Sequence, residues 1–243
     1  MTSQLRELVL CWMAWGGIDE GLAPGAEALE AGFGGVESPT RPGAEPRAIA
    51  AWEHRHGYRL PSGLRAWLML SNGLYRGGPL LHPISAIGPM VVFSRMEDLL
   101  VQPESWFEIG NPNVETVCID LAYRWPGGGF PIFTSGDPAS GSPPRVVARS
   151  FEEWFLELLR RGGREYWLDA DFAGLGDPWQ SHRRFTPPPE LPARLAPFAG
   201  RAASFVLARA DEREAAESLG LSPDDVEILF RHLQHVIPDM LPK

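Results

Sequence analysis

The chain has 243 residues, of which 31 are acidic and 22 are basic, so its formal net charge is −9. Its only lysine is Lys243, which excludes a Walker A motif, a Schiff-base lysine and a Ser-x-x-Lys hydrolase, since each needs an internal lysine. The negative charge disfavours nucleic acid as a partner, because an acidic chain repels a phosphate backbone. With 26 glycines and 24 prolines, the composition predicts a globular protein with many turns.

The cysteine content and the apolar runs indicate where the protein works. Cys11 and Cys118 are far apart in the chain, which is typical of a reducing compartment and excludes a disulfide framework. No apolar run approaches the ~18 residues that a membrane span requires. The apolar stretch from Leu8 to Trp15 is not followed by a small-x-small cleavage site. We therefore expect a cytoplasmic protein without a membrane partner.

The N-terminal third is predicted to be helical. An apolar face at helical spacing precedes the stop at Gly16-Gly17, a short helix is expected over 26–31, and 38–46 has the composition of a linker. Residues 47–56 form the next predicted helix, and a further helix begins at Leu60-Pro61-Ser62 and ends at Asn72-Gly73. The residues on the first apolar face are Leu5, Leu8, Val9, Trp12 and Met13.

From about residue 80 the pattern changes to short apolar runs broken by glycine and proline, which is typical of strands and turns. Apolar and polar residues alternate over 116–121, the period of a half-buried strand. A helix follows, with Ser150 and Glu153 as a capping box and Gly162-Gly163 as its stop. The predicted strands are 106–109, 116–121, 130–133 and 145–148.

The C-terminal part is predicted to begin with a proline-rich linker or extended wrap over 170–192. One helix is expected over 202–219, and a second is capped by Ser222 and ends at Pro238. Helices, then strands, then helices predict an α+β fold with a mixed or mostly antiparallel sheet and helices packed against it. An extra N-terminal helix (1–44) and a C-terminal wrap with helices (163–243) flank the predicted central domain (45–162).

No catalytic motif of the types HExxH, GxSxG, GxGxxG or CxxC is present. Cys118 with His54 or His82 is a conceivable nucleophile pair, but a cysteine on an alternating strand is better explained as a buried residue. His232 and His235 have the same-face spacing of metal ligands but lack a third partner. We therefore expect a protein that is not an enzyme and that has no cofactor or metal.

The C-terminal helices allow two interpretations. Ala216, Gly220 and Val226 have the spacing of a helix-turn-helix, so a transcriptional regulator that binds DNA through about 202–237 is the alternative function. The same region is acidic, which opposes contact with phosphates and instead suits a basic protein partner. The candidate partner-binding residues are Asp211, Glu212, Glu214, Glu217, Asp224, Asp225 and Glu227.

A set of short motifs in the central part resembles the SUKH superfamily, which comprises fungal cell-wall-synthesis regulators of the Smi/Knr type and their bacterial relatives. The motifs are an acidic residue in a first helix, a Gly, a Leu-Pro step, an Asn-Gly turn, a later Ile-Gly step and a closing aromatic helix. The residues that carry them are Trp52, Glu53, Gly57, Leu60, Pro61, Asn72, Gly73, Gly110, Phe151, Trp154 and Phe155. The resemblance covers about residues 45–162.

Each of these residues has a structural explanation, as a helix stop or as an inward-facing apolar side chain. The resemblance implies a non-catalytic module that binds a protein. It also implies an immunity protein, which neutralises a cognate bacterial toxin by occluding it. We expect a basic toxin domain as the partner.

Overall fold

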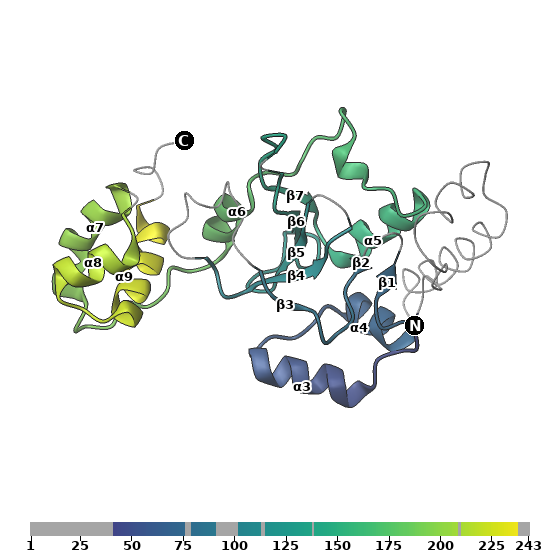
Figure 1. The fold of residues 1–243 in the computed structure, drawn as a ribbon, viewed down its shortest axis with the longest axis horizontal. Coiled ribbons are helices and arrows are strands. Elements are labelled where there is room, and N and C mark those ends of the chain that lie inside the picture. The colour runs from purple at the N-terminus through teal and green to yellow at the C-terminus, as the bar shows by residue number, and fades with distance from the viewer. Residues whose placement is uncertain are drawn as a thin grey trace.

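The computed structural model describes residues 41–75, 79–90, 102–112, 115–137, 139–208 and 210–237. The two helices predicted before residue 40 lie outside these residues. The described chain begins with two helices, continues through short strands and ends in helices (Figure 1). The helices are α3 (Pro46–His56), α4 (Ser62–Leu70), α5 (Phe151–Arg160), α6 (Pro178–Phe185), α7 (Ala199–Ala208), α8 (Glu212–Leu219) and α9 (Pro223–Val236), with short 3-10 turns η2 (Tyr166–Leu168) and η3 (Ala196–Phe198).

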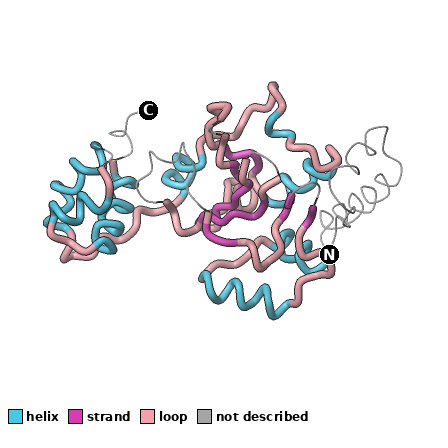
Figure 2. Tube along the Cα trace, viewed as in Figure 1, coloured by secondary structure: helices cyan, strands magenta, loops and turns pink. Residues whose placement is uncertain are grey.

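The strands form two antiparallel sheets (Figure 2). One is a pair, β1–β2, and the other has five strands in the sequential order β3-β4-β5-β6-β7. The α+β class with an antiparallel sheet is therefore confirmed. The strands are β1 (Leu74–Tyr75), β2 (Pro79–Leu81), β3 (Gly88–Pro89), β4 (Trp106–Gly110), β5 (Val117–Asp120), β6 (Ile132–Thr134) and β7 (Arg145–Ala148).

The first face of the five-stranded sheet packs against α3, α4 and α5 and forms the main hydrophobic core. Inward side chains from the three helices meet Phe107 and Ile119 of the sheet, and the rings of Trp67 and Phe155 pack edge to face at 4.6 Å. Each fully buried aromatic side chain removes roughly 150–250 Å² from water, so these rings dominate the stability of the core. The aromatic side chains that are fully buried here include Trp67, Phe107, Phe151, Trp154 and Phe155.

The second face of the same sheet is also covered. Trp106, Cys118, Phe133 and Val146 point to this side and pack against Trp179 of α6. All four residues of β5 are buried. The predicted half-buried strand is therefore wrong, because the alternate positions of β5 point into a second apolar layer and not into water.

Two boundaries in the C-terminal part differ from prediction. The segment 170–192 is not only a linker, because it contains α6. The Asp177 side chain caps the N-terminus of α6 by accepting a hydrogen bond from the Gln180 amide, and Pro178 lies in the first turn. The single helix predicted over 202–219 is two helices, α7 and α8. Asp211 begins α8 by accepting from the backbone N–H of Arg213.

Helices α7, α8 and α9 pack on one another around their own apolar core and lie beside α6 in Figure 1. The glycine at the α8–α9 turn, Gly220, has φ 70° and ends α8 in the left-handed region. No helix among the described residues is long and apolar enough to cross a membrane. The buried residues of this second core are Leu195, Ala202, Val206, Ala215, Ala216, Leu219, Val226, Leu229, Phe230 and Leu233.

The start of α5 confirms Ser150 as the predicted N-cap, but the Glu153 carboxylate bonds to the residue before the cap, and a further contact connects distant parts of the chain. The Ser150 hydroxyl accepts from the Glu153 amide, and the Glu153 carboxylate accepts from the Arg149 amide at 2.7 Å. The neighbouring Glu152 carboxylate accepts from the amide of Gly63 at 3.0 Å, in the first turn of α4. A Cβ atom on Gly63 would lie 2.4 Å from that carboxylate oxygen, so a larger residue there would displace the Glu152 side chain from this contact.

The junction between α3 and α4 is held by a buried carboxylate. Glu53 is 5% exposed, and it accepts from the amide of Leu60 at 3.1 Å. It also accepts from the guanidinium groups of Arg59 at 3.0 Å and Arg65 at 2.9 Å. These charge-assisted hydrogen bonds compensate the loss of hydration of the carboxylate.

The substitution Glu53→Gln is expected to lower the free energy of unfolding by about 2–4 kcal/mol, because the amide cannot accept from all three donors. Urea unfolding followed by circular dichroism measures the change. Glu45→Gln is the matched control: Glu45 is exposed and pairs with the exposed Arg47, so its loss should cost less than about 0.5 kcal/mol. Equal costs for the two variants would contradict the assigned role.

Candidate functional site

An open groove runs beside α5 and has a volume of about 900 Å³. Its apolar lining comes from β7, α5 and the segment that follows α5, and the 127–129 turn lies at its edge. This turn packs closely against Arg149, the residue after β7, because a Cβ atom on Gly128 would lie 2.9 Å from the Cβ of Arg149. The apolar lining residues are Val147, Leu156, Tyr166, Phe172 and Leu175.

The charged residues around the groove neutralise one another. Arg149 pairs with Glu153 at 3.4 Å, and Arg161 pairs with Glu157 at 2.7 Å and with Asp169 at 2.6 Å. Such exposed pairs contribute little to stability, but they hold the side chains in place around the apolar lining. The lining of the groove therefore has no excess of either charge.

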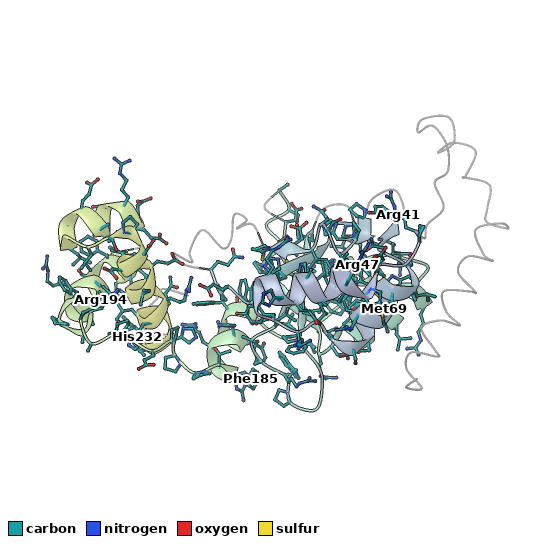
Figure 3. The ribbon with its side chains drawn as sticks, turned by 90° about the horizontal axis from the view of Figure 1, so that it is seen from below. Arg41, Arg47, Met69, Phe185, Arg194 and His232 are labelled. Atoms are coloured by element: carbon teal, nitrogen blue, oxygen red, sulfur yellow. The ribbon has the colours of Figure 1, made fainter. Side chains whose placement is uncertain are left out.

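The seven acidic residues proposed from the sequence lie on α8, on α9 or at their N-termini, and many have local partners. Asp225 pairs with Arg194 at 2.6 Å, Glu217 pairs with Arg213 at 3.3 Å, and Glu227 pairs with Arg231. Figure 3 labels Arg194, which lies beside the unit formed by α7–α9. Asp211 caps α8. The cluster is therefore less negative than its sequence suggests.

Apart from the capping residue Asp211, three of the seven acidic residues have no ion pair with another described residue. Glu214 and Asp224 are exposed, and no ion pair joins either of them to another described residue. Burial and the carboxylates of Glu227 and Asp211 raise the pKa of Glu212. The residual negative charge of this surface is thus concentrated at Glu212, Glu214 and Asp224.

The helix-turn-helix alternative has the expected elements but an unfavourable charge. Helices α8 and α9 are joined through Gly220, as the spacing predicts. The first turn of α9, which would approach DNA, carries Asp224 and Asp225. Arg231 is held by Glu104 at 2.6 Å and by Glu227, so it does not offset them. DNA binding stays a prediction that the electrostatics oppose.

The residues of the family-like motifs lie at turns and in the core. Gly57 has φ 73° and Gly73 has φ 107°, a region that favours glycine. Pro61 directly precedes α4, and the Asn72 side chain accepts from the Ile84 amide at 2.8 Å. Gly110 allows close approach of the neighbouring strand, since a Cβ there would lie 2.3 Å from the Leu80 oxygen. The remaining members, Trp52, Glu53, Leu60, Phe151, Trp154 and Phe155, are buried.

The other candidate chemical groups have structural surroundings. Cys118 is fully buried, and burial raises the pKa of its thiol well above its ordinary value, which disfavours a nucleophilic thiolate. His232 Nδ1 donates to the carbonyl oxygen of Pro189 at 2.8 Å, so this nitrogen is used in a backbone contact. Among the described residues, no group of three or more His, Cys, Asp or Glu is arranged to hold a metal ion.

Sequence reasoning missed a buried network at Asp120, the last residue of β5. The carboxylate is 2% exposed and accepts from Ser105 Oγ at 2.7 Å, Trp106 Nε1 at 2.9 Å and the Ala122 amide at 2.9 Å. Its fourth partner is Nδ1 of His182 on α6, at 2.6 Å. The one signal in the sequence is an aspartate at the end of a strand that is otherwise apolar.

Beyond α6, the network continues to α9. The rings of His182 and His235 are 5.5 Å apart, and Trp179 stacks on His182 with an interplanar angle of 5°. His235 Nδ1 donates to the Arg231 carbonyl at 3.0 Å. Burial lowers the pKa of His235 below its ordinary value of 6.5, with His182 and Arg183 acting in the same direction and the Arg231 carbonyl opposing them.

These features together describe an α+β domain that is followed in the chain by a helical unit, α7–α9, with its own apolar core. The model of the SMI1 / KNR4 family (SUKH-1) matches residues 43–157. This match confirms the resemblance to the SUKH superfamily noted in the sequence for this part of the chain. No curated protein matches the sequence. The family match ends inside α5, so α6 and α7–α9 lie outside it.

The stability of the contact between α6 and α9 is expected to decrease as the pH falls below 6.5. The native state disfavours the protonated form of His235, so its contribution is present above the ordinary pKa of 6.5 and is lost as protons bind. Thermal unfolding at pH 7.5 and 5.5, with an NMR titration of the His235 ring, measures the effect. The variant His235→Gln should show a smaller difference between the two pH values, and an identical difference would contradict this assignment.

Proposed function

We propose that the chain is a non-catalytic protein-binding module that acts as an immunity protein and neutralises a bacterial toxin by occluding it. The observation that carries this proposal is the SUKH-1 match over residues 43–157. Members of the superfamily are commonly binding modules, as the resemblance implied. The described part of the chain offers an open groove of about 900 Å³ beside α5, which supports contact with a protein surface.

Occlusion needs no bond to be made or broken by this chain. The rigid core of α3–α5 and the sheet keeps the groove in one shape, so little conformational entropy is lost when a partner binds. The negative surface of α8 and α9 attracts a basic partner and accelerates encounter without adding much to the final affinity. The substrate groove of a nuclease is a basic surface of this kind.

The proposal is tested by purifying the tagged full chain from its native host and identifying what stays bound. A protein at a fixed stoichiometry is expected, and the first candidate is the product of the neighbouring open reading frame. Co-expression of that product with and without this chain then shows whether growth is restored. A bound metabolite or nucleic acid in place of a protein, or a partner whose toxicity this chain leaves unchanged, would overturn the proposal.

Reversal of the unpaired charge on α9 is expected to slow association with the basic partner. Asp224→Arg removes an exposed carboxylate that has no ion pair with another described residue, so the association rate should fall about two- to tenfold at low salt, with little change in dissociation. Stopped-flow or surface plasmon resonance at two salt concentrations measures this.

The matched control is Glu45→Arg, which makes the same change in net charge at an exposed position before α3. Its association rate should stay close to that of the unaltered chain. If both variants slow binding equally, the effect belongs to the net charge of the protein and not to the α8–α9 surface.

A further inference from the structure

Helix α6 lies on the second face of the sheet as an addition to a domain that already has its main core. That core is closed by α3, α4 and α5 on the first face, and the family match ends at residue 157, before α6 begins. Between α5 and α6 the chain forms only one short 3-10 turn. Figure 1 shows α6 between the five-stranded sheet and α7–α9.

The contact between α6 and the sheet uses one face of the helix. Trp179 packs edge-on against Trp106 with the ring centroids 6.1 Å apart and an interplanar angle of 86°. His182 reaches Asp120, and Phe185 stacks on Tyr123 at 5.2 Å. The three α6 residues are spaced i, i+3 and i+6, so they follow one side of a helix, the pattern by which a short helix is recognised in a groove.

Phe185 extends this contact toward the solvent. Its ring is also 5.6 Å from that of Trp125, and both rings are only partly buried. In Figure 3, Phe185 lies between the sheet domain and the helical unit that carries Arg194 and His232. The helix is therefore held by aromatic contacts at its two ends and by an ionisable pair at its centre.

The carboxylate of Asp120, at the centre of this contact, is oriented to accept a hydrogen bond from α6. Asp120 accepts three hydrogen bonds from Ser105, Trp106 and Ala122, all inside the family-matched part, and these fix its orientation. The remaining position is filled only by His182. A buried carboxylate among aromatic side chains is costly unless all its acceptor sites are used, so this position selects for a hydrogen-bond donor, which His182 supplies here.

We propose that this face, which we call the Asp120 face, is a helix-binding site that the chain fills with its own α6. The site fits a partner helix that presents a large aromatic side chain and, three residues later, an imidazole donor, and such a helix binds by displacing α6. The residues of the face are Trp106, Asp120, Tyr123, Trp125 and Phe133. This proposal does not depend on the identity of the partner as a toxin.

Covalent connection keeps the Asp120 face closed in the intact chain. A segment attached by a short connection acts at an effective concentration in the millimolar range, so a free helix must compete with α6. The apparent affinity of the competitor equals its affinity for the open site multiplied by the fraction of molecules in which the site is open. Weakening α6 while the face stays intact must therefore increase the affinity for the same helix supplied as a separate peptide.

The experiment uses the full chain and a fluorescent peptide with the sequence of residues 176–187. The double variant Trp179→Ala, His182→Ala is expected to bind this peptide at least about tenfold more tightly than the unaltered chain, as measured by fluorescence anisotropy. Adding Asp120→Asn to the double variant should weaken binding about tenfold, because the charged acceptor for the peptide imidazole is lost. A peptide with alanine in place of its tryptophan should bind weakly to every variant.

Gln180→Ala is the matched control, since Gln180 lies on α6 with an exposed side chain. Peptide affinity for this variant should equal that of the unaltered chain. Hydrogen exchange on the double variant provides the second measurement, and the amides of α3, α4 and α5 should keep their protection. The proposal is overturned if the double variant binds the peptide no better than the unaltered chain, or if α3–α5 lose protection together with the Asp120 face, because α6 is then part of the fold and not a ligand.

Discussion

The five-stranded sheet has to be covered on both faces, and the rest of the structure follows from this requirement. Phe107 and Ile119 point to one side, while Trp106 and Cys118 point to the other, and all are buried. A sheet with two apolar faces needs two layers of cover, because each exposed face would leave large aromatic surfaces in water. Helices α3–α5 supply one layer from within the family-matched part. The other layer comes from α6, which the chain adds after it.

Predictions from the sequence succeeded where the determining signals are local. The limits of β7 and the start of α5 follow from neighbouring residues, such as the Ser150 N-cap. Strands β1 and β3 were missed because two-residue strands show no alternation, and only their sheet partners define them. Helix α6 was missed because its eight residues lie between proline-rich stretches, although Asp177-Pro178 is a typical helix start.

The site was harder to predict because its contacts join residues that are distant in the sequence. The acidic residues of α8 and α9 were recognisable as a group, but the pairing of Asp225 was not, because Arg194 lies 31 positions away. His182 and Asp120 are 62 positions apart, and nothing near either residue indicates the other. Local patterns identify residue types that can interact, whereas burial and pairing depend on the tertiary fold.

The hydrogen bond from the Gly63 amide to Glu152 has a consequence for how the chain acquires its structure. It joins residues 89 positions apart and caps the start of α4 with a side chain from α5. During synthesis the residues of α3 and α4 are therefore translated long before Glu152, which caps α4, is added to the chain. Closing so long a loop before the contact forms is slow, since the chain entropy is lost before the stabilising interactions are gained. The SUKH-type domain is thus expected to fold late, once α5 has left the ribosome, and not helix by helix from its N-terminal side.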